Sequence, residues 1–285
     1  MLNKIKNKEI NIDNCPIINN SSNKNCLKKD IDIDLSSEEN TLTSYLDQYD
    51  VSITYEELSS NYSYSYNSYK EYYGASLIKI VDALYLIDNN INLDTDLKLS
   101  KTAKNLSSTC LDNYSSNSNI SLRTLLYCAL NKSDNGAHYD LINYIGINNL
   151  KQYALDLQSY LTISKEDYYG IQTSYNTNIY LKRLYYLLTN SNEANFLKNT
   201  MINNNENYLY LDNINILHKY GYYDNYYHDI GLVLDNYPYT ISILTSLGKD
   251  NYQSIVNEIA NKVYNLHESY WQEKKEYCNF LIYGD

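Results

Sequence analysis

The stretch SLIKIVDALYLI, residues 76–87, constrains the fold of this chain more than any other segment. A helix built from it is apolar on nearly every side, and such a helix is buried in the interior of a protein. Asn89 and Asn90 follow the stretch and favour the end of the helix. Lys79 then lies in the first turn of a buried helix, where a lysine costs free energy unless it has partners. The sequence therefore predicts a central helix that carries a cation in its first turn.

Strand patterns lie on both sides of a long helical stretch. Tyr62, Tyr64 and Tyr66 alternate with small polar residues, which is the period of a β-strand. The fold class predicted is α+β, a two-lobed antiparallel sheet of about five strands flanked by helices, with an inserted all-helical lobe. The expected strands are 51–58, 61–69, 213–221, 229–235 and 239–247, and the expected helices are 41–49, 76–87, 121–130, 148–157, 178–188, 192–202 and 251–275.

The same patterns predict how the chain is divided. Residues 1–38 are rich in Asn, Ser, Lys and Asp and are expected to form a flexible N-terminal tail. Residues 39–75 and 205–285 are expected to form the sheet lobe, and residues 76–204 the helical lobe. The two lobes together are expected to make one domain of a monomer.

Composition excludes several classes of partner. The net charge is −11 and no block of basic residues occurs, so nucleic acid is not expected as a partner. No apolar run reaches about 18 residues, so no membrane segment is expected. The N-terminal residues lack the continuous apolar stretch of a signal peptide, and the sequence by itself predicts a cytoplasmic protein.

Cysteine and histidine patterns predict neither disulfides nor a metal. The number of cysteines is odd and no CxxC occurs, so we expect buried or idle thiols rather than a disulfide framework or a zinc site. The histidines form no cluster with ligand spacing, and no glycine-rich phosphate loop is present. No cofactor is therefore expected. The five cysteines are Cys15, Cys26, Cys110, Cys128 and Cys278.

Ser76 and Lys79 form the first motif with chemical meaning. Residues three apart share one face of a helix, and the helix N-terminus offers free backbone N–H groups to a developing oxyanion. A lysine held among apolar residues and near another cation has a lowered pKa and can act as a base. This geometry can produce a nucleophilic serine. The structural alternative is a lysine that extends out of a core helix to solvent.

Two further motifs are weak when taken singly. Ser133-Asp134-Asn135 lies in an expected loop between two helices, where an ordinary turn and helix cap is the alternative interpretation. Lys219-Tyr220-Gly221 lies at the end of an expected strand, where the alternative is an edge lysine near a turn.

Taken in this order, the three motifs resemble those of the penicillin-recognising serine hydrolases, in particular the class A β-lactamases. The segments ALNKSDNGAHYDLINYIG and HKYGYYDNYYHDIGLVL are also similar to the family's segments around the second and third motifs. The resemblance covers about residues 41–275. It implies an antiparallel sheet lobe split by a helical lobe, with the site between the two.

The resemblance also implies roles for the motif residues. Ser76 is the acylated nucleophile and Lys79 is the base or proton relay. Ser133 passes a proton to the leaving nitrogen, and Lys219 faces the substrate carboxylate and helps to set the pKa values of Ser133 and Lys79. The implied substrate-binding residues are Asn135 for the substrate amide, Tyr220, Gly221, and Tyr222, whose backbone N–H joins that of Ser76 in the oxyanion hole.

The chain departs from the family pattern at two places. Tyr220 stands where the third motif normally has Thr or Ser, so a bulky ring replaces a short hydroxyl beside the substrate carboxylate. The loop that carries the deacylating glutamate in class A β-lactamases corresponds to YLTISKEDYYGIQTSYNT here. Glu166 is a candidate for the deacylation base by position, but no Asn follows it four residues later.

Three functions remain open on these grounds. The first is a serine hydrolase that opens β-lactam rings through an acyl-enzyme at Ser76. The second is a penicillin-binding D-alanyl peptidase or esterase with slow deacylation, and the third is a ligand-binding homologue without turnover. Each predicts a small-molecule substrate or ligand. The resemblance itself implies work outside the cytoplasm, which is where the family usually acts.

Overall fold

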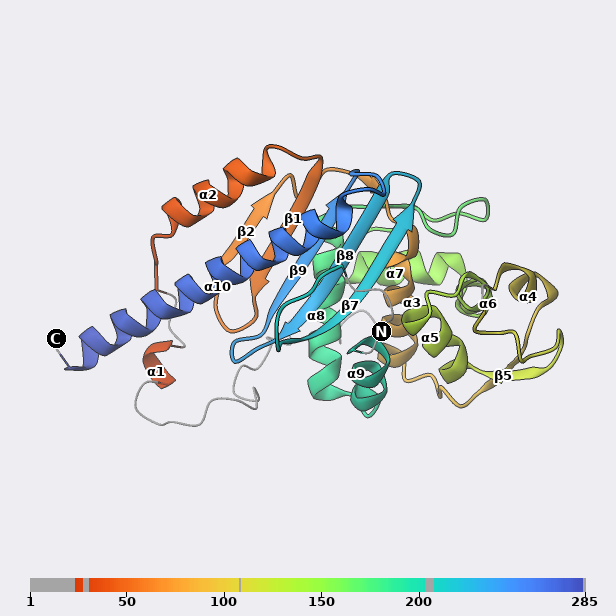
Figure 1. Cartoon of the computed structure of the whole chain (residues 1–285). Coiled ribbons are helices and arrows are strands. Elements are labelled where there is room, and N and C mark those ends of the chain that lie inside the picture. The colour runs from red at the N-terminus through yellow and green to blue at the C-terminus, as the bar shows by residue number, and fades with distance from the viewer. Residues whose placement is uncertain (1–23, 28–30, 108, 203–207, 284–285) are drawn as a thin grey trace.

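A five-stranded antiparallel sheet forms the centre of the protein. The computed structural model describes residues 24–27, 31–107, 109–202 and 208–283 (Figure 1). The strand order is β2-β1-β9-β8-β7, so strands from both ends of the chain meet in one sheet, as predicted. β1 joins the two halves by pairing with β9, with Ile53 opposite Ile243. The strands are β1 (Val51–Glu57), β2 (Ser63–Tyr66), β3 (Tyr72–Tyr73), β4 (Asp96–Lys98), β5 (Asn119–Ser121), β6 (Ile171–Gln172), β7 (Asn215–Tyr223), β8 (Tyr226–Leu234) and β9 (Tyr239–Thr245).

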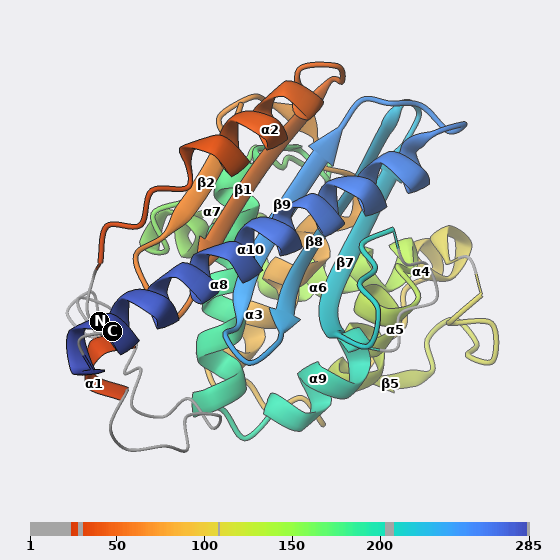
Figure 2. The same ribbon diagram turned by 60° about the vertical axis from the view of Figure 1, so that its left-hand side comes forward.

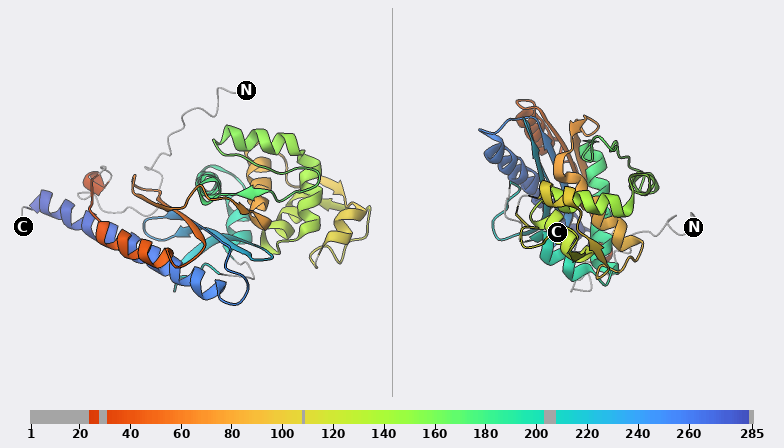
Figure 3. Two further views of the ribbon diagram at one scale, coloured as in Figure 1. Left: turned by 90° about the horizontal axis from the view of Figure 1, so that it is seen from above. Right: turned by 90° about the vertical axis from the view of Figure 1, so that its right-hand side faces the viewer.

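Helices cover both faces of this sheet. α2 and α10 lie across one face (Figure 2), while α8 and the inserted helical lobe lie on the other (Figure 3). The predicted α+β class with a helical insertion is confirmed. The helices are α1 (Lys24–Leu27), α2 (Ser36–Leu46), α3 (Lys79–Asp88), α4 (Lys101–Leu106), α5 (Leu122–Asn131), α6 (Asn135–Ile145), α7 (Ile147–Asp156), α8 (Ser174–Asn190), α9 (Ala194–Ile202) and α10 (Tyr252–Tyr283).

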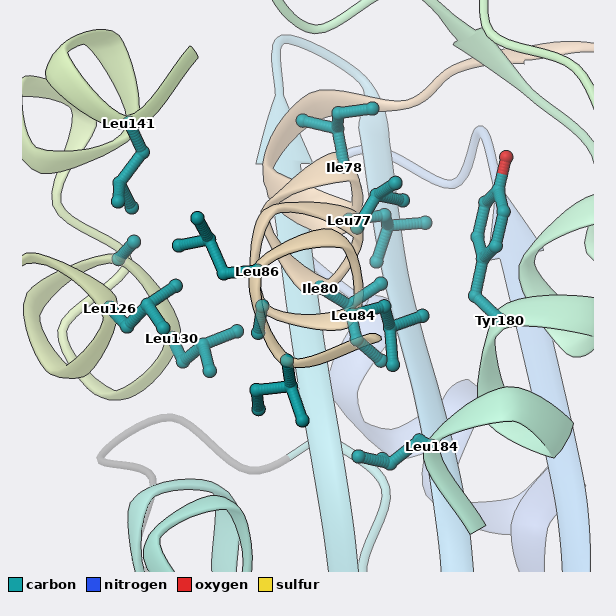
Figure 4. Close-up of a cluster of buried hydrophobic side chains, with 14 of the residues drawn as sticks. Leu77, Ile78, Ile80, Leu84, Leu86, Leu126, Leu130, Leu141, Tyr180 and Leu184 are labelled. Carbon is teal, nitrogen blue, oxygen red and sulfur yellow. The ribbon is translucent and has the colours of Figure 1, made fainter. Parts of the chain in front are cut away.

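The core of the helical lobe is built around α3, as its all-round apolar pattern predicts. Leu86 points toward Leu126 and Leu130 of α5, while Leu84 lies on the side of Leu184 of α8 (Figure 4). All five leucines belong to one buried cluster together with residues of α6 and of the sheet. A helix enclosed on several sides has a fixed position, so groups at its N-terminal end are held firmly.

The predicted tail is described only in part. Residues 1–23 and 28–30 lie outside the described residues, whereas Leu35 is buried and α2 begins at Ser36. The proposed division into tail and lobes stays a prediction. Within the described part of the chain, no helix combines the length and the apolar character needed to cross a membrane.

The expectation of idle thiols is wrong for four of the five cysteines. Cys110 is disulfide-bonded to Cys128, and Cys26 is bonded to Cys278 near the end of α10. The partners are 18 and 252 residues apart, so no short motif could reveal them. Cys15 lies outside the described residues and accounts for the odd number that argued against disulfides.

Candidate active site

Ser76 lies on a tight turn immediately before α3. A 3₁₀ turn over Ala75–Ile78 leads into the regular helix, which begins at Lys79 rather than at Ser76. Ala75 has a φ of 45°, a left-handed conformation that costs a residue with a side chain of order 1–3 kcal/mol. Leu77 and Ile78 anchor the turn in the core, whereas Ser76 is partly exposed. The turn therefore presents the serine hydroxyl to solvent at the end of a fixed element.

Lys79 is the group that connects the motifs. Its side chain is completely buried, and its Nζ donates to Ser76 Oγ at 2.9 Å. It also donates to Ser133 O at 2.5 Å and to Asn135 Oδ1 at 2.7 Å. An ammonium has three protons, so these three neutral acceptors satisfy it without an opposite charge.

Burial and a neighbouring cation shift the pKa of Lys79. Removal from water lowers this pKa well below its usual value, and the charge of Lys219 lowers it further. Asp134 and Asp82 act in the opposite direction but do not reverse the shift. A neutral amine is therefore accessible to Lys79, and in that form it can take the proton of the Ser76 hydroxyl.

Ser133 lies in the connection between α5 and α6, with a φ of 52°. Asp134 caps α6, because its Oδ1 accepts from the backbone N–H of Ala137 at 2.9 Å. The other oxygen of Asp134 accepts from Ser107 Oγ at 2.6 Å. Asp134 therefore forms an ordinary helix cap, as the alternative interpretation expected. The cap also holds the neighbouring Ser133 and Asn135 next to Lys79.

Lys219 reaches the same serine from β7. Its side chain is completely buried, and its Nζ donates to Ser133 Oγ at 3.0 Å and to Tyr220 O at 2.7 Å. Lys79 Nζ lies 3.4 Å from the same hydroxyl oxygen. The Ser133 hydroxyl thus lies between two lysines, which is an arrangement that can pass a proton between them.

Gly221 allows β7 to come close to the Ser76 turn. A Cβ at this position would lie 3.1 Å from Ser76 N and 3.2 Å from Gly74 O, which is closer than most side-chain contacts. Tyr222 follows on the same strand, and its exposed ring stacks on Tyr227 at 6.0 Å. A side chain at position 221 would push the strand away from the nucleophile.

Tyr220 is packed rather than free. Its ring is 7% exposed and belongs to the core on the α10 face, where it packs edge-on against Tyr208 with centroids 5.7 Å apart. Lys219 Nζ lies 4.1 Å from the ring centroid, a favourable cation–π contact. The bulky side chain of the third motif therefore packs against the buried Lys219. The assignment of Tyr220 as a substrate-binding residue stays a prediction.

The loop that was expected to carry the deacylation base presents a tyrosine to Lys79. Glu166 is exposed, and its carboxylate accepts a hydrogen bond from Ser164 Oγ at 2.9 Å. Tyr169 instead lies over Lys79, with the lysine Nζ 5.8 Å from the ring centroid. Burial raises the pKa of Tyr169 to about 12, so its phenol is neutral at physiological pH. The structure thus does not bring Glu166 together with the other predicted site residues.

Asp82 and His138 were not predicted as site residues. Asp82 lies one turn after Lys79 in α3, and its Oδ2 is 2.6 Å from His138 Nδ1. His138 Nε2 lies 3.2 Å from Tyr168 O, and its ring lies 5.5 Å from that of Tyr169. This buried pair therefore attaches the loop to the helix that carries Lys79. An acid within the apolar helix is the sequence signal that could have indicated it.

The two histidines of the sheet, His218 and His228, hold neighbouring segments in place. His228 is completely buried, with Nε2 2.9 Å from Tyr73 O and Nδ1 accepting from Thr245 N–H at 3.0 Å. It holds the segment that precedes Ser76 against the sheet. His218 is buried and pairs with Asp229 at 3.1 Å.

Comparisons with known proteins give a family match and similar folds. The family model for the beta-lactamase enzyme family matches residues 35–267. The TLA-3 extended-spectrum β-lactamase structure is similar with a TM-score of 0.72 at 23% identity, covering 82% of this chain and 99% of that one. The TLA-1 enzyme gives 0.71 at 23% identity, covering 81% and 98%.

A penicillin-binding protein also has this fold. PBP-A, as an acyl-enzyme complex of a variant with penicillin G, gives a TM-score of 0.70 at 16% identity, covering 82% of this chain and 97% of that one. At these identities the structures show a shared fold. No curated protein sequence matches the chain.

Proposed function

Because the chain belongs to the beta-lactamase enzyme family, we propose that it is a serine hydrolase that opens β-lactam rings through an acyl-enzyme at Ser76. One observation carries the proposal: the Nζ of a buried lysine with a lowered pKa lies 2.9 Å from the Ser76 hydroxyl oxygen. A base at that distance can remove the hydroxyl proton as the oxygen attacks a carbonyl carbon.

Each neighbouring group then has a part in acylation. Neutral Lys79 takes the proton from Ser76, and the oxyanion faces the backbone N–H groups of Ser76 and Tyr222. Ser133, between Lys79 and Lys219, gives its proton to the leaving nitrogen and regains one from a lysine. Asn135 Oδ1 is occupied by Lys79, so its amide nitrogen remains as the donor to the substrate's side-chain amide.

A second candidate is a penicillin-binding peptidase or esterase whose acyl-enzyme is long-lived. The position of Tyr169 favours it, because a neutral phenol lies over Lys79 where a carboxylate could have activated water. PBP-A, one of the similar structures, was captured as an acyl-enzyme with penicillin G. The two candidates share the acylation step and differ in the rate of hydrolysis of the ester.

Mass spectrometry of the intact protein separates these candidates. Mixing with excess penicillin and sampling from seconds to hours should give an adduct on the parent and none on Ser76→Ala. An adduct that turns over quickly supports the β-lactamase, and an adduct that persists supports the penicillin-binding protein. If neither adduct nor opened drug is found, both are wrong and a ligand-binding homologue without turnover is the remaining reading.

The disulfides support a further part of the proposal, namely that the protein works in an oxidising compartment. Structural disulfides persist mainly outside the cytoplasm. The Cys26–Cys278 and Cys110–Cys128 pairs therefore favour the family's usual location over the cytoplasmic expectation from the sequence. Alkylation of protein isolated from its native source should leave both pairs unmodified until a reductant is added.

A further inference from the structure

A second group of ionisable side chains lies on the opposite face of the sheet, beneath α10. His267 is completely buried there, and its Nδ1 lies 2.6 Å from Glu57 Oε1. The other oxygen of Glu57 accepts from Trp271 Nε1 at 3.0 Å. Since the Glu57 carboxylate accepts hydrogen bonds here, Nδ1 carries the proton. In the neutral form of the imidazole, which is the form that binds metals, the free lone pair is then on Nε2.

That nitrogen has no hydrogen bond although it is buried. Among the described residues, none supplies a hydrogen-bond partner to His267 Nε2. It faces Asp235 Oδ2 at 3.6 Å and Glu268 Oε1 at 3.8 Å. Both distances are too long for a hydrogen bond. A buried acceptor without a partner costs free energy, so this nitrogen requires an explanation.

The spacing fits ligands of one metal ion. The three ligand atoms of His267, Asp235 and Glu268 all lie within 4.8 Å of one another. In a tetrahedral site with bonds of roughly 2.0–2.2 Å, neighbouring ligand atoms are about 3.3–3.6 Å apart. The two distances from Nε2 therefore need only a small contraction around an ion.

Tyr239 gives a second, independent sign. Its ring lies 4.6 Å from the His267 ring, and within the described part of the chain its buried hydroxyl has no hydrogen-bond partner. Two buried polar atoms that lack a hydrogen-bond partner among the described residues thus belong to adjoining rings.

We propose that His267, Asp235 and Glu268 bind a divalent transition-metal ion, with Zn²⁺ as the best fit. One imidazole nitrogen with two carboxylates suits Zn²⁺ better than Mg²⁺ or Ca²⁺, which prefer oxygen ligands. Glu57 is the outer carboxylate that orients the histidine, as is usual for metal-bound imidazoles. Asp235 and Glu268 are 16% and 59% exposed, so an ion can enter from solvent and keep water as a further ligand.

Such an ion would cross-link α10 to the turn between β8 and β9. Asp235 lies just after β8 in the turn before β9, while His267 and Glu268 lie in the middle of α10. The site is on the face opposite to α3 and its role is structural. An ion bound only by the folded protein stabilises it in proportion to ligand concentration and affinity.

The test uses the full chain after dialysis against a chelator. Isothermal titration with Zn²⁺ should show one saturable equivalent. The melting temperature should rise by about 5 °C at a free metal concentration roughly a hundred times the dissociation constant. Co²⁺ as a spectroscopic probe should give the visible bands of a low-coordinate nitrogen and oxygen site.

The matched variants remove ligands and leave the packing in place. In Asp235→Asn/Glu268→Gln both altered side chains are at least partly exposed, so the protein should still fold. It should no longer bind one equivalent of Zn²⁺, and the rise in melting temperature and the cobalt bands should disappear. Glu273→Gln removes an exposed carboxylate of the same helix outside the cluster and should keep all three.

Two outcomes would overturn the proposal. One is a metal-free parent that takes up no saturable Zn²⁺ and melts at the same temperature with or without it. The other is equal binding by the parent and the double variant, which would place the ion elsewhere on the chain. The rate of acylation by penicillin is a separate readout and should not depend on Zn²⁺, so failure of the catalytic proposal leaves this test intact.

Discussion

The ionisable groups on the two faces of the sheet have different immediate neighbours. Toward the helical lobe, Lys79 and Lys219 are completely buried on either side of the Ser133 hydroxyl. Toward α10, a single buried histidine faces the carboxylates of three acids, Glu57, Asp235 and Glu268. Burial and the nearby charge of Lys219 lower the pKa of Lys79, whereas carboxylates around a histidine attract a cation. The same sheet therefore supports chemistry on one face and, on our proposal, a stabilising ion on the other.

The largest expected effect is on the rate of acylation when Lys79 is replaced. Lys79→Gln removes the base from Ser76 and should slow acylation by penicillin by about 10²–10⁴-fold. Intact-protein mass spectrometry, with the adduct followed from milliseconds by quenched flow, measures the rate constant. The change is expected in the chemical step, because the Ser76 turn is anchored by Leu77 and Ile78 rather than by Lys79.

The chain offers a matched control for this variant. Lys274 is also completely buried, but it lies on α10, where its Nζ contacts Tyr270 OH at 3.2 Å. Lys274→Gln should lower the free energy of unfolding and leave the acylation rate constant of the folded protein within about twofold. Equal loss of acylation in both variants would contradict a specific role for Lys79.

The second prediction concerns how the free energy of unfolding depends on pH through His228, which holds the segment before the Ser76 turn. Burial lowers the pKa of His228 from 6.5 to about 4. The folded state therefore disfavours the charged form, and stability that is present above pH 6.5 is lost as the pH falls toward 4. The difference corresponds to about 3 kcal/mol, because each pKa unit is worth about 1.4 kcal/mol. Protonation of Nδ1 would also break its bond from Thr245 N–H.

Urea unfolding at pH 7, 5.5 and 4 measures this loss. The parent should lose more stability across the series than His228→Gln, which cannot titrate there. Carboxylates contribute to acid unfolding in both proteins, so the difference between the two slopes isolates the histidine. Parallel slopes would mean that His228 is not kept neutral by the fold.

The sequence predicted best what rests on local pattern. The all-round apolar run placed α3 in the core, and three apolar stretches joined by short turns in 213–247 placed the C-terminal strands. The spacing of Ser76 and Lys79 put both groups on one side of the turn, as the 2.9 Å contact shows. These features depend on residues close together in the chain, where periodicity and helix geometry act.

What the sequence could not predict depends on residues far apart. The cysteines of one disulfide are 252 residues apart, and His267 is 210 residues from Glu57. Neither pair has a spacing that sequence patterns encode, because only tertiary packing brings them together. The contact of Tyr169 with Lys79 was not predicted for a different reason: the family pattern implies an acid in this loop, whereas the side chain over the lysine is a phenol.

The smallest expected effect concerns that loop. Glu166→Gln should change the lifetime of the acyl-enzyme by less than about twofold, because the carboxylate is exposed and bonded to Ser164 rather than directed at Lys79. The measurement is the decay of the penicillin adduct after removal of free drug. A lifetime prolonged a hundredfold would show that the loop rearranges in the acyl-enzyme and brings Glu166 to the ester. An unchanged lifetime would mean that Glu166 takes no part in deacylation, and the neutral phenol of Tyr169 that lies over Lys79 would then account for slow hydrolysis of the ester.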